Sequence, residues 1–88
     1  IKSKRNGDFM DTFKTKDLFE AAWLHSNNIP FIHLEPENSF FWFVFSNKNQ
    51  CQDLSSVFWS QNAQGNISFF INSLKMLKDL IFSRRSNY

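Results

Sequence analysis

The stretch Phe40-Phe41-Trp42-Phe43-Val44-Phe45 decides the fold of this chain. Aromatic and β-branched residues fit a pleated sheet surface, so the stretch predicts a β-strand. Side chains alternate across a sheet, so every second residue shares a face. One face then carries Phe41, Phe43 and Phe45. The other face carries Phe40, Trp42 and Val44. Both faces are apolar, whereas a strand with one wet face would show polar residues on that side.

Each face of this strand needs cover. Full burial of one such side chain contributes roughly 1.5–3 kcal/mol, and an exposed apolar strand would invite aggregation. Either helices of the chain cover both faces, or one face is covered by another chain, a second copy or stacked nucleic-acid bases. Cover by the chain's own helices and neighbouring hydrophobic side chains is the simpler expectation.

The composition bounds the class of protein. A chain of 88 residues with twelve Phe and three Trp has material for one modest core. Ten Lys plus Arg against eight Asp plus Glu give a net charge of +2, too small to indicate nucleic-acid binding by itself. The single cysteine, Cys51, excludes an internal disulfide and favours a cytoplasmic location. No stretch reaches the roughly 18 apolar residues of a membrane span, so no membrane partner is expected.

The pattern before the central strand predicts a tail, a strand and a helix. Residues 1–8 resemble a flexible basic tail, and residues 9–88 form a single domain that opens with a short strand at 9–13. Thr15 fits an N-cap for a helix over residues 16–26. Residues at helical spacing form the expected buried stripe of that helix, flanked by a second row. The stripe is Leu18, Ala21, Ala22 and His25, and the flanking row is Phe19 and Trp23.

An antiparallel hairpin is expected over residues 29–45. Its first strand covers residues 29–35 and contains Pro30, which lacks an amide donor. This strand should therefore lie at a sheet edge, or begin at the proline. The turn-forming residues 36–39 then lead into the strand that begins at Phe40.

Two further helices are expected after the hairpin. Asn47 caps the first, over residues 48–59, with Gln50 in a capping-box position. Its apolar face is Cys51, Leu54, Val57 and Phe58. A loop at 61–66 leads to Ile67, which is expected to extend beside the sheet, and to a helix over 69–84 capped by Ser68. The buried stripe of this helix is Phe70, Leu74, Leu77 and Ile81, widened by Phe69, Ile71, Leu80 and Phe82. The fold class is therefore α+β with the order β-α-β-β-α-α, and helices pack on at least one face of the sheet.

Several short segments resemble a small family, seen in bacteria and their phages, that is known only as a domain of unknown function. The matching segments are Phe13-Lys14-Thr15-Lys16-Asp17-Leu18, Ala21-Ala22, Phe43-Val44-Phe45, Ser73-Leu74-Lys75 and Leu77-Lys78-Asp79-Leu80. The resemblance covers residues 13–83. It implies the same element order and implies no activity, because the family has none assigned.

No catalytic residue, metal ligand or cofactor site is predicted. His25, His33 and Cys51 lack the close ligand pairs of a zinc site, and nothing local pairs the thiol with a histidine as a nucleophile. We expect His25 to have a packing or capping role and Cys51 to be a small core residue. The carboxylates come in two pairs, and both pairs are expected on the solvated surface. These are Glu35 with Glu37, and Asp17 with Glu20.

The candidate interaction face consists of the second face of the central strand together with lysines of the last helix. Its residues are Phe40, Trp42, Val44, Lys75 and Lys78. The first hypothesis is a non-enzymatic interaction module that assembles through this apolar sheet face or the C-terminal helix, with itself or with a protein partner. The second is a nucleic-acid-binding accessory protein of a phage or mobile element, because aromatics inside a basic rim hold single strands. The alternative is that Lys75 and Lys78 form the solvent-exposed side of an amphipathic helix.

Overall fold

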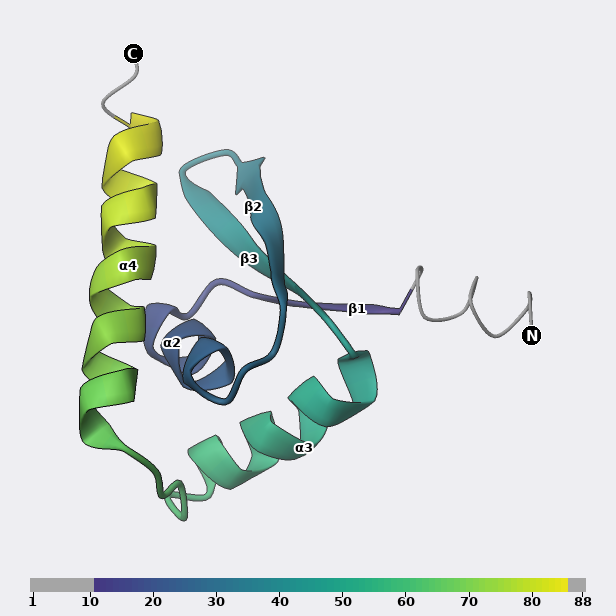
Figure 1. The fold of residues 1–88 in the computed structure, drawn as a ribbon. Coiled ribbons are helices and arrows are strands. Elements are labelled where there is room, and N and C mark those ends of the chain that lie inside the picture. Colours follow the sequence, from purple (N-terminus) through teal and green to yellow (C-terminus); the bar gives the residue numbers. More distant parts are fainter. Residues whose placement is uncertain (1–10, 86–88) are drawn as a thin grey trace.

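A computed structural model describes residues 11–85 of the chain. The elements are β1 (Thr12–Thr15), α2 (Leu18–Ser26), β2 (Phe31–Glu37), β3 (Phe40–Ser46), α3 (Lys48–Trp59) and α4 (Ile67–Arg85) (Figure 1). This α+β order, β-α-β-β-α-α, is the one predicted. The expected tail at 1–8 and the first two residues of the expected strand at 9–13 lie outside the described residues.

The sheet has three antiparallel strands in the order β1-β3-β2, so the phenylalanine-rich strand β3 is central. The predicted hairpin joins β2 to β3 with Glu37 opposite Phe40, and Asn38 takes up a positive φ of 35° in the turn. Pro30 directly precedes β2, which is an edge strand, so its missing N–H costs no ladder bond.

The inner face of the sheet, which we define by Phe41, Phe43 and Phe45 on β3, packs against all three helices. Phe43 and Phe45 are buried in one core with residues of α2, α3 and α4. Ala21 and Ala22 on α2 have no exposed surface, so this helix approaches its neighbours closely. In Figure 1, α2 lies between the sheet and α4, and α3 runs below them.

The outer face, which we define by Phe40, Trp42 and Val44, is covered differently. Phe40 and Trp42 are half-buried and Val44 is buried. Lys14 and Lys16, on β1 and just after it, place their ammonium groups over the rings of Trp42 and Phe40. Helix cover therefore applies to the inner face, and the outer face is shielded by long side chains from the neighbouring chain segments.

The start of α2 differs from the prediction. Asp17, not Thr15, is the N-cap, and its Oδ1 accepts a hydrogen bond of 2.8 Å from the amide of Glu20. The Thr15 hydroxyl instead donates to Oε1 of Glu20 at 2.5 Å. The expectation that Glu20 is solvated is wrong, because only 6% of it is exposed. Phe19, which was expected beside the buried stripe, is exposed, whereas Leu24 is buried in the core.

The ends of α3 and α4 also correct the prediction. Asn47 holds the N-cap position of α3, as predicted, but its backbone is left-handed and its side chain makes no cap bond. Asn66, not Ser68, caps α4, because its Oδ1 accepts from the amide of Phe69 at 3.0 Å. Ile67 is the first residue of α4 and does not extend beside the sheet. Four residues expected on buried helix faces are instead exposed, namely Val57, Phe69, Ile71 and Phe82.

Candidate functional site

The structure brings the three sheet residues of the predicted interaction face together on the outer face. The Phe40 and Trp42 rings meet edge to face, with centroids 5.4 Å apart. The Lys14 ammonium lies 5.4 Å from the centroid of Trp42, and that of Lys16 lies 5.1 Å from the centroid of Phe40. A cation at this distance is attracted by the ring quadrupole. The aromatic pair therefore already has cationic partners within its own chain.

The outer face is also neutralised locally. Nζ of Lys14 lies 3.2 Å from Oε2 of Glu35 on β2, across β3. Beside this ion pair is a hollow of about 600 Å³ over Val44, bounded also by Ile32 and His33. The carboxylate sets this surface apart from a basic groove that would follow a nucleic-acid backbone.

Lys75 and Lys78, the two helical residues of the predicted face, do not join the outer face. They lie on α4, which packs against the inner-face core through Leu77. Both belong to a row of exposed residues at helical spacings of three and four, which we call the outward stripe. The outward stripe is Ile67, Ile71, Lys75, Lys78, Phe82 and Arg85.

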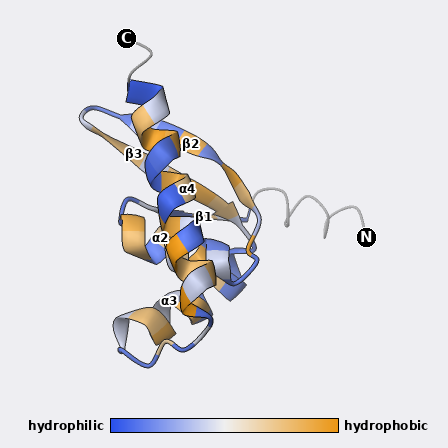
Figure 2. Ribbon diagram, turned by 60° about the vertical axis from the view of Figure 1, so that its left-hand side comes forward, coloured by the Kyte–Doolittle hydropathy of each residue, from blue (hydrophilic) through white to orange (hydrophobic). Residues whose placement is uncertain are grey.

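The outward stripe exposes large apolar side chains. Ile67 is 76% exposed, Phe82 is 73% exposed and Ile71 is 42% exposed. Lys75 and Lys78 lie between Ile71 and Phe82, Arg85 follows Phe82, and the six residues of the stripe include no carboxylate. Figure 2, in which α4 comes forward, shows hydrophobic and hydrophilic bands along this helix.

The sequence feature that indicated exposed apolar residues on α4 was the wide apolar arc of the last helix, which exceeds what one packing contact buries. Within residues 11–85, no helix meets the length and hydropathy of a membrane span.

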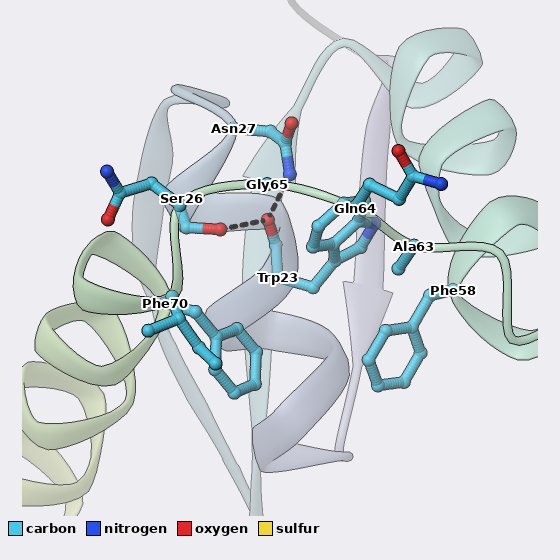
Figure 3. Close-up of a pocket in the computed structure, with 10 residues that line it drawn as sticks. Trp23, Ser26, Asn27, Phe58, Ala63, Gln64, Gly65 and Phe70 are labelled. Atoms are coloured by element: carbon cyan, nitrogen blue, oxygen red, sulfur yellow. Dashed lines mark hydrogen bonds between the residues drawn. The ribbon is translucent and has the colours of Figure 1, made fainter.

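A pocket that no sequence pattern predicted lies at the N-terminal end of α4. Three aromatic side chains from three helices surround it, namely Trp23 of α2, Phe58 of α3 and Phe70 of α4 (Figure 3). Its volume is about 470 Å³. The loop at 60–66 closes one side, and its Gly65 passes over Trp23. Loops that bring three helices together leave no periodic signal, so a sequence pattern could not reveal this pocket.

The polar groups near this pocket are largely occupied. The indole N–H of Trp23 donates to the carbonyl of Leu54 at 2.9 Å. The carbonyl of Trp23 accepts from Ser26 Oγ at 2.9 Å and from Asn27 Nδ2 at 2.8 Å. None of the lining residues is charged. The pocket therefore presents three aromatic rings, together with the uncharged polar side chains of Ser26, Asn27, Gln64 and Asn66.

A buried carboxylate ties α2 to α3. Glu20 accepts hydrogen bonds from the hydroxyl of Ser55 and, at 3.0 Å, from the indole N–H of Trp59, besides the bond from Thr15. Burial, with the nearby charge of Glu20, raises the pKa of the Cys51 thiol to about 11. The thiol donates to the carbonyl of Ser46 at 3.3 Å, as expected of a small core residue. The cluster holds helices together and leaves Cys51 protonated at neutral pH.

The two histidines lie in different surroundings. His25 Nδ1 is 2.8 Å from the hydroxyl of Ser73, which links α2 to α4, and burial lowers the pKa of this histidine. This is the packing role expected for His25. His33 borders the hollow on the outer face. Among residues 11–85, no group of three or more His, Cys, Asp or Glu side chains is placed to hold a metal ion.

Comparison with known proteins gives a family and no activity. Neither the curated proteins nor the solved structures include a significant match to this chain. The segments that resemble an uncharacterised family lie on β1, α2, β3 and α4, which are the elements that build the core. A family model described as a domain of unknown function, DUF5659, matches residues 10–83, and the chain belongs to that family.

Proposed function

We propose that this domain is a non-enzymatic interaction module that binds an acidic amphipathic helix of a partner protein through the outward stripe of α4. The observation that carries the proposal is the exposure of Ile67, Ile71 and Phe82 in one row with three cations. Exposed apolar side chains that share a helix face with charged residues are a feature of interaction sites, and here they form two apolar ends with Lys75 and Lys78 between them. A helix that lays its apolar face along such a row is a recurring mode of recognition.

The charge of the stripe supports an acidic partner. Lys75 and Lys78 separate Ile71 from Phe82, and Arg85 follows at the end. The 19 residues of α4 span about 28 Å at a rise of 1.5 Å per residue, which is enough for a partner helix to contact both apolar ends. A partner with apolar residues at its ends and carboxylates between them would match this pattern.

The same charges disfavour self-association through α4. In an antiparallel pair of α4 helices, Lys75 of one copy would lie near Lys78 of the other. Like charges placed opposite each other oppose association. We therefore place a different protein chain, and not a second copy, on the outward stripe.

A second candidate function is binding of single-stranded nucleic acid on the outer face. The specific observation in its favour is the Phe40–Trp42 pair with Lys14 and Lys16 beside it. Bases stack on exposed aromatic rings in such sites. Here the lysine ammonium groups already lie over the rings, and Glu35 adds a negative charge, so a base would have to displace them. The two candidates differ in the residue that binding requires, Lys78 for the first and Trp42 for the second.

Two observations support the non-enzymatic part of the proposal. The Cys51 thiol, with a pKa of about 11, is not a nucleophile at neutral pH. Ser73 is only 5% exposed, and its hydroxyl lies 2.8 Å from His25 Nδ1 in a contact that links α2 to α4, which is a packing role. The free thiol and the family resemblance also lead us to propose a cytoplasmic setting in bacteria or their phages.

Calorimetric titration with two synthetic helical peptides tests the proposal. Both peptides have the 19-residue length of α4 and carry leucines spaced to meet Ile67, Ile71 and Phe82. One has glutamates between the leucines and the other has lysines. The glutamate peptide is expected to bind more tightly than the lysine peptide. Lys78→Glu is expected to weaken the affinity for the glutamate peptide by roughly fivefold, because the attraction between residue 78 and the peptide's glutamates becomes a repulsion.

Lys48→Glu on α3 is the matched control, because it makes the same charge change on another exposed helix. It should leave the binding of the glutamate peptide unchanged. Equal binding of the two peptides, or an equal effect of the two substitutions, would contradict the proposal. Added salt should reduce the difference between the peptides, since exposed charge pairs are screened.

A further inference from the structure

We infer that the pocket between Trp23, Phe58 and Phe70 receives a large uncharged aromatic side chain from the same partner helix. The inference rests on the proposed function, because it adds an anchor point to the surface proposed above. It assigns a role to a pocket that contributes nothing to the charge pattern of the outward stripe.

The pocket is continuous with the outward stripe. Ile67 lines the pocket and is also the first residue of the stripe. Because 76% of Ile67 is exposed, the pocket borders solvent on the side where the stripe begins. A partner helix that follows α4 therefore passes the pocket at one of its ends.

Three rings in the lining favour an aromatic occupant. Trp23 and Phe58 have their ring centroids 6.3 Å apart and are inclined by 27°. Phe70 comes from the other side of the pocket, on α4 (Figure 3). A further ring can pack edge to face or offset against such rings. The Trp23 indole N–H and carbonyl are both already engaged, so they offer little to a charged group.

The size of the pocket also fits an anchor residue. Its volume of about 470 Å³ holds a bulky ring with room to spare. In protein interfaces, a few aromatic residues that fill pockets contribute most of the binding energy. An aromatic anchor beside a charged stripe would combine affinity from the pocket with selectivity from the cations.

Gly65 offers a way to fill the pocket without removing a core side chain. An added Cβ there would lie 3.7 Å from Cζ3 of Trp23, an ordinary contact. Gly65 does not have a positive φ, so larger residues adopt its backbone conformation without strain. Gly65→Leu would place its side chain in the pocket, and Gly65→Ala is the matched control that leaves the pocket open.

The test uses two versions of the glutamate peptide, with Trp or Ala at the end that meets Ile67. The Trp peptide is expected to bind the domain at least about tenfold more tightly than the Ala peptide. Gly65→Leu should abolish this advantage and leave the affinity for the Ala peptide unchanged. Gly65→Ala should preserve the advantage. A thermal unfolding curve of each variant checks that the fold is intact.

The outcomes separate this inference from the proposed function. If the Trp and Ala peptides bind equally and Lys78→Glu still weakens both, the inference of an aromatic anchor would be overturned. The proposal that the outward stripe binds an acidic helix would stand. If Lys78→Glu did not weaken the binding of either peptide, the proposed function itself would be overturned. Free indole that binds more tightly than the Trp peptide, and is excluded by Gly65→Leu, would overturn the inference in favour of a small-molecule site.

Discussion

The outer face of the sheet and the outward stripe of α4 are both apolar surfaces outside the core, yet they are exposed to different degrees. On the outer face, Trp42 and Phe40 are half-buried beneath lysines that come from β1 and the residue after it. On the outward stripe, Ile67 and Phe82 are about three-quarters exposed. A strand has neighbours on both sides, whose long side chains can lie over its aromatic residues. An outermost helix has a neighbour on one side only.

This difference determines which surface is better suited to bind a partner. A partner on the outer face would first displace the Lys14 contacts with Trp42 and Glu35. A partner on the outward stripe displaces water from apolar side chains, which is favourable, and its carboxylates replace water around the three cations. The stripe is therefore the surface where new contacts bring the larger gain.

The largest expected effect contrasts the two sides of α4. Leu77→Ala removes a fully buried side chain and is expected to lower the free energy of unfolding by about 2–5 kcal/mol. Phe82→Ala is expected to change it by no more than about 0.5 kcal/mol, because the side chain lies mainly in solvent. Urea unfolding followed by circular dichroism measures both. A cost for Phe82→Ala as large as that for Leu77→Ala would show that the stripe is part of the fold.

A smaller effect is expected on the outer face. Trp42→Ala removes a half-buried ring and should lower the free energy of unfolding by about 1–2 kcal/mol. The same variant tests the second candidate function, by titration of a labelled single-stranded oligonucleotide at low and high salt. Salt-sensitive binding by the wild type that disappears in a folded Trp42→Ala protein would favour nucleic acid over the acidic helix.

The sequence was sufficient to predict the elements whose signal is local. The phenylalanine-rich strand, the hairpin and the helix at 48–59 follow from residue type, periodicity and turn chemistry. The predicted caps at Thr15 and Ser68 each lie two residues from the observed ones, because Asp17 and Asn66 compete for the same role. Glu20 was misplaced for another reason. Its burial depends on hydrogen bonds from Ser55 and Trp59, more than thirty residues away.

The candidate site was predictable only in part. Alternation along β3 grouped Phe40, Trp42 and Val44 correctly on one face. It could not tell on which side of the sheet α4 lies, so Lys75 and Lys78 were grouped with the wrong elements. The cations near the rings are Lys14 and Lys16. Their position follows from the register of β1 against β3, which depends on packing over the whole sheet.

The smallest effect is expected from Lys14→Met, which tests whether the lysines shield the outer face. Lys14→Met keeps the aliphatic stem but removes the ammonium group, and with it the contacts to Trp42 and Glu35. The expected loss in the free energy of unfolding is about 1 kcal/mol or less at low salt, because both contacts are partly exposed. Lys48→Met makes the same chemical change on α3 and should cost less. If the loss exceeds that of Lys48→Met at low salt and shrinks at high salt, the charge itself shields Trp42. An identical loss for the two variants would mean that the aromatic pair needs no cation, and the outer face would then be as available to a partner as the outward stripe.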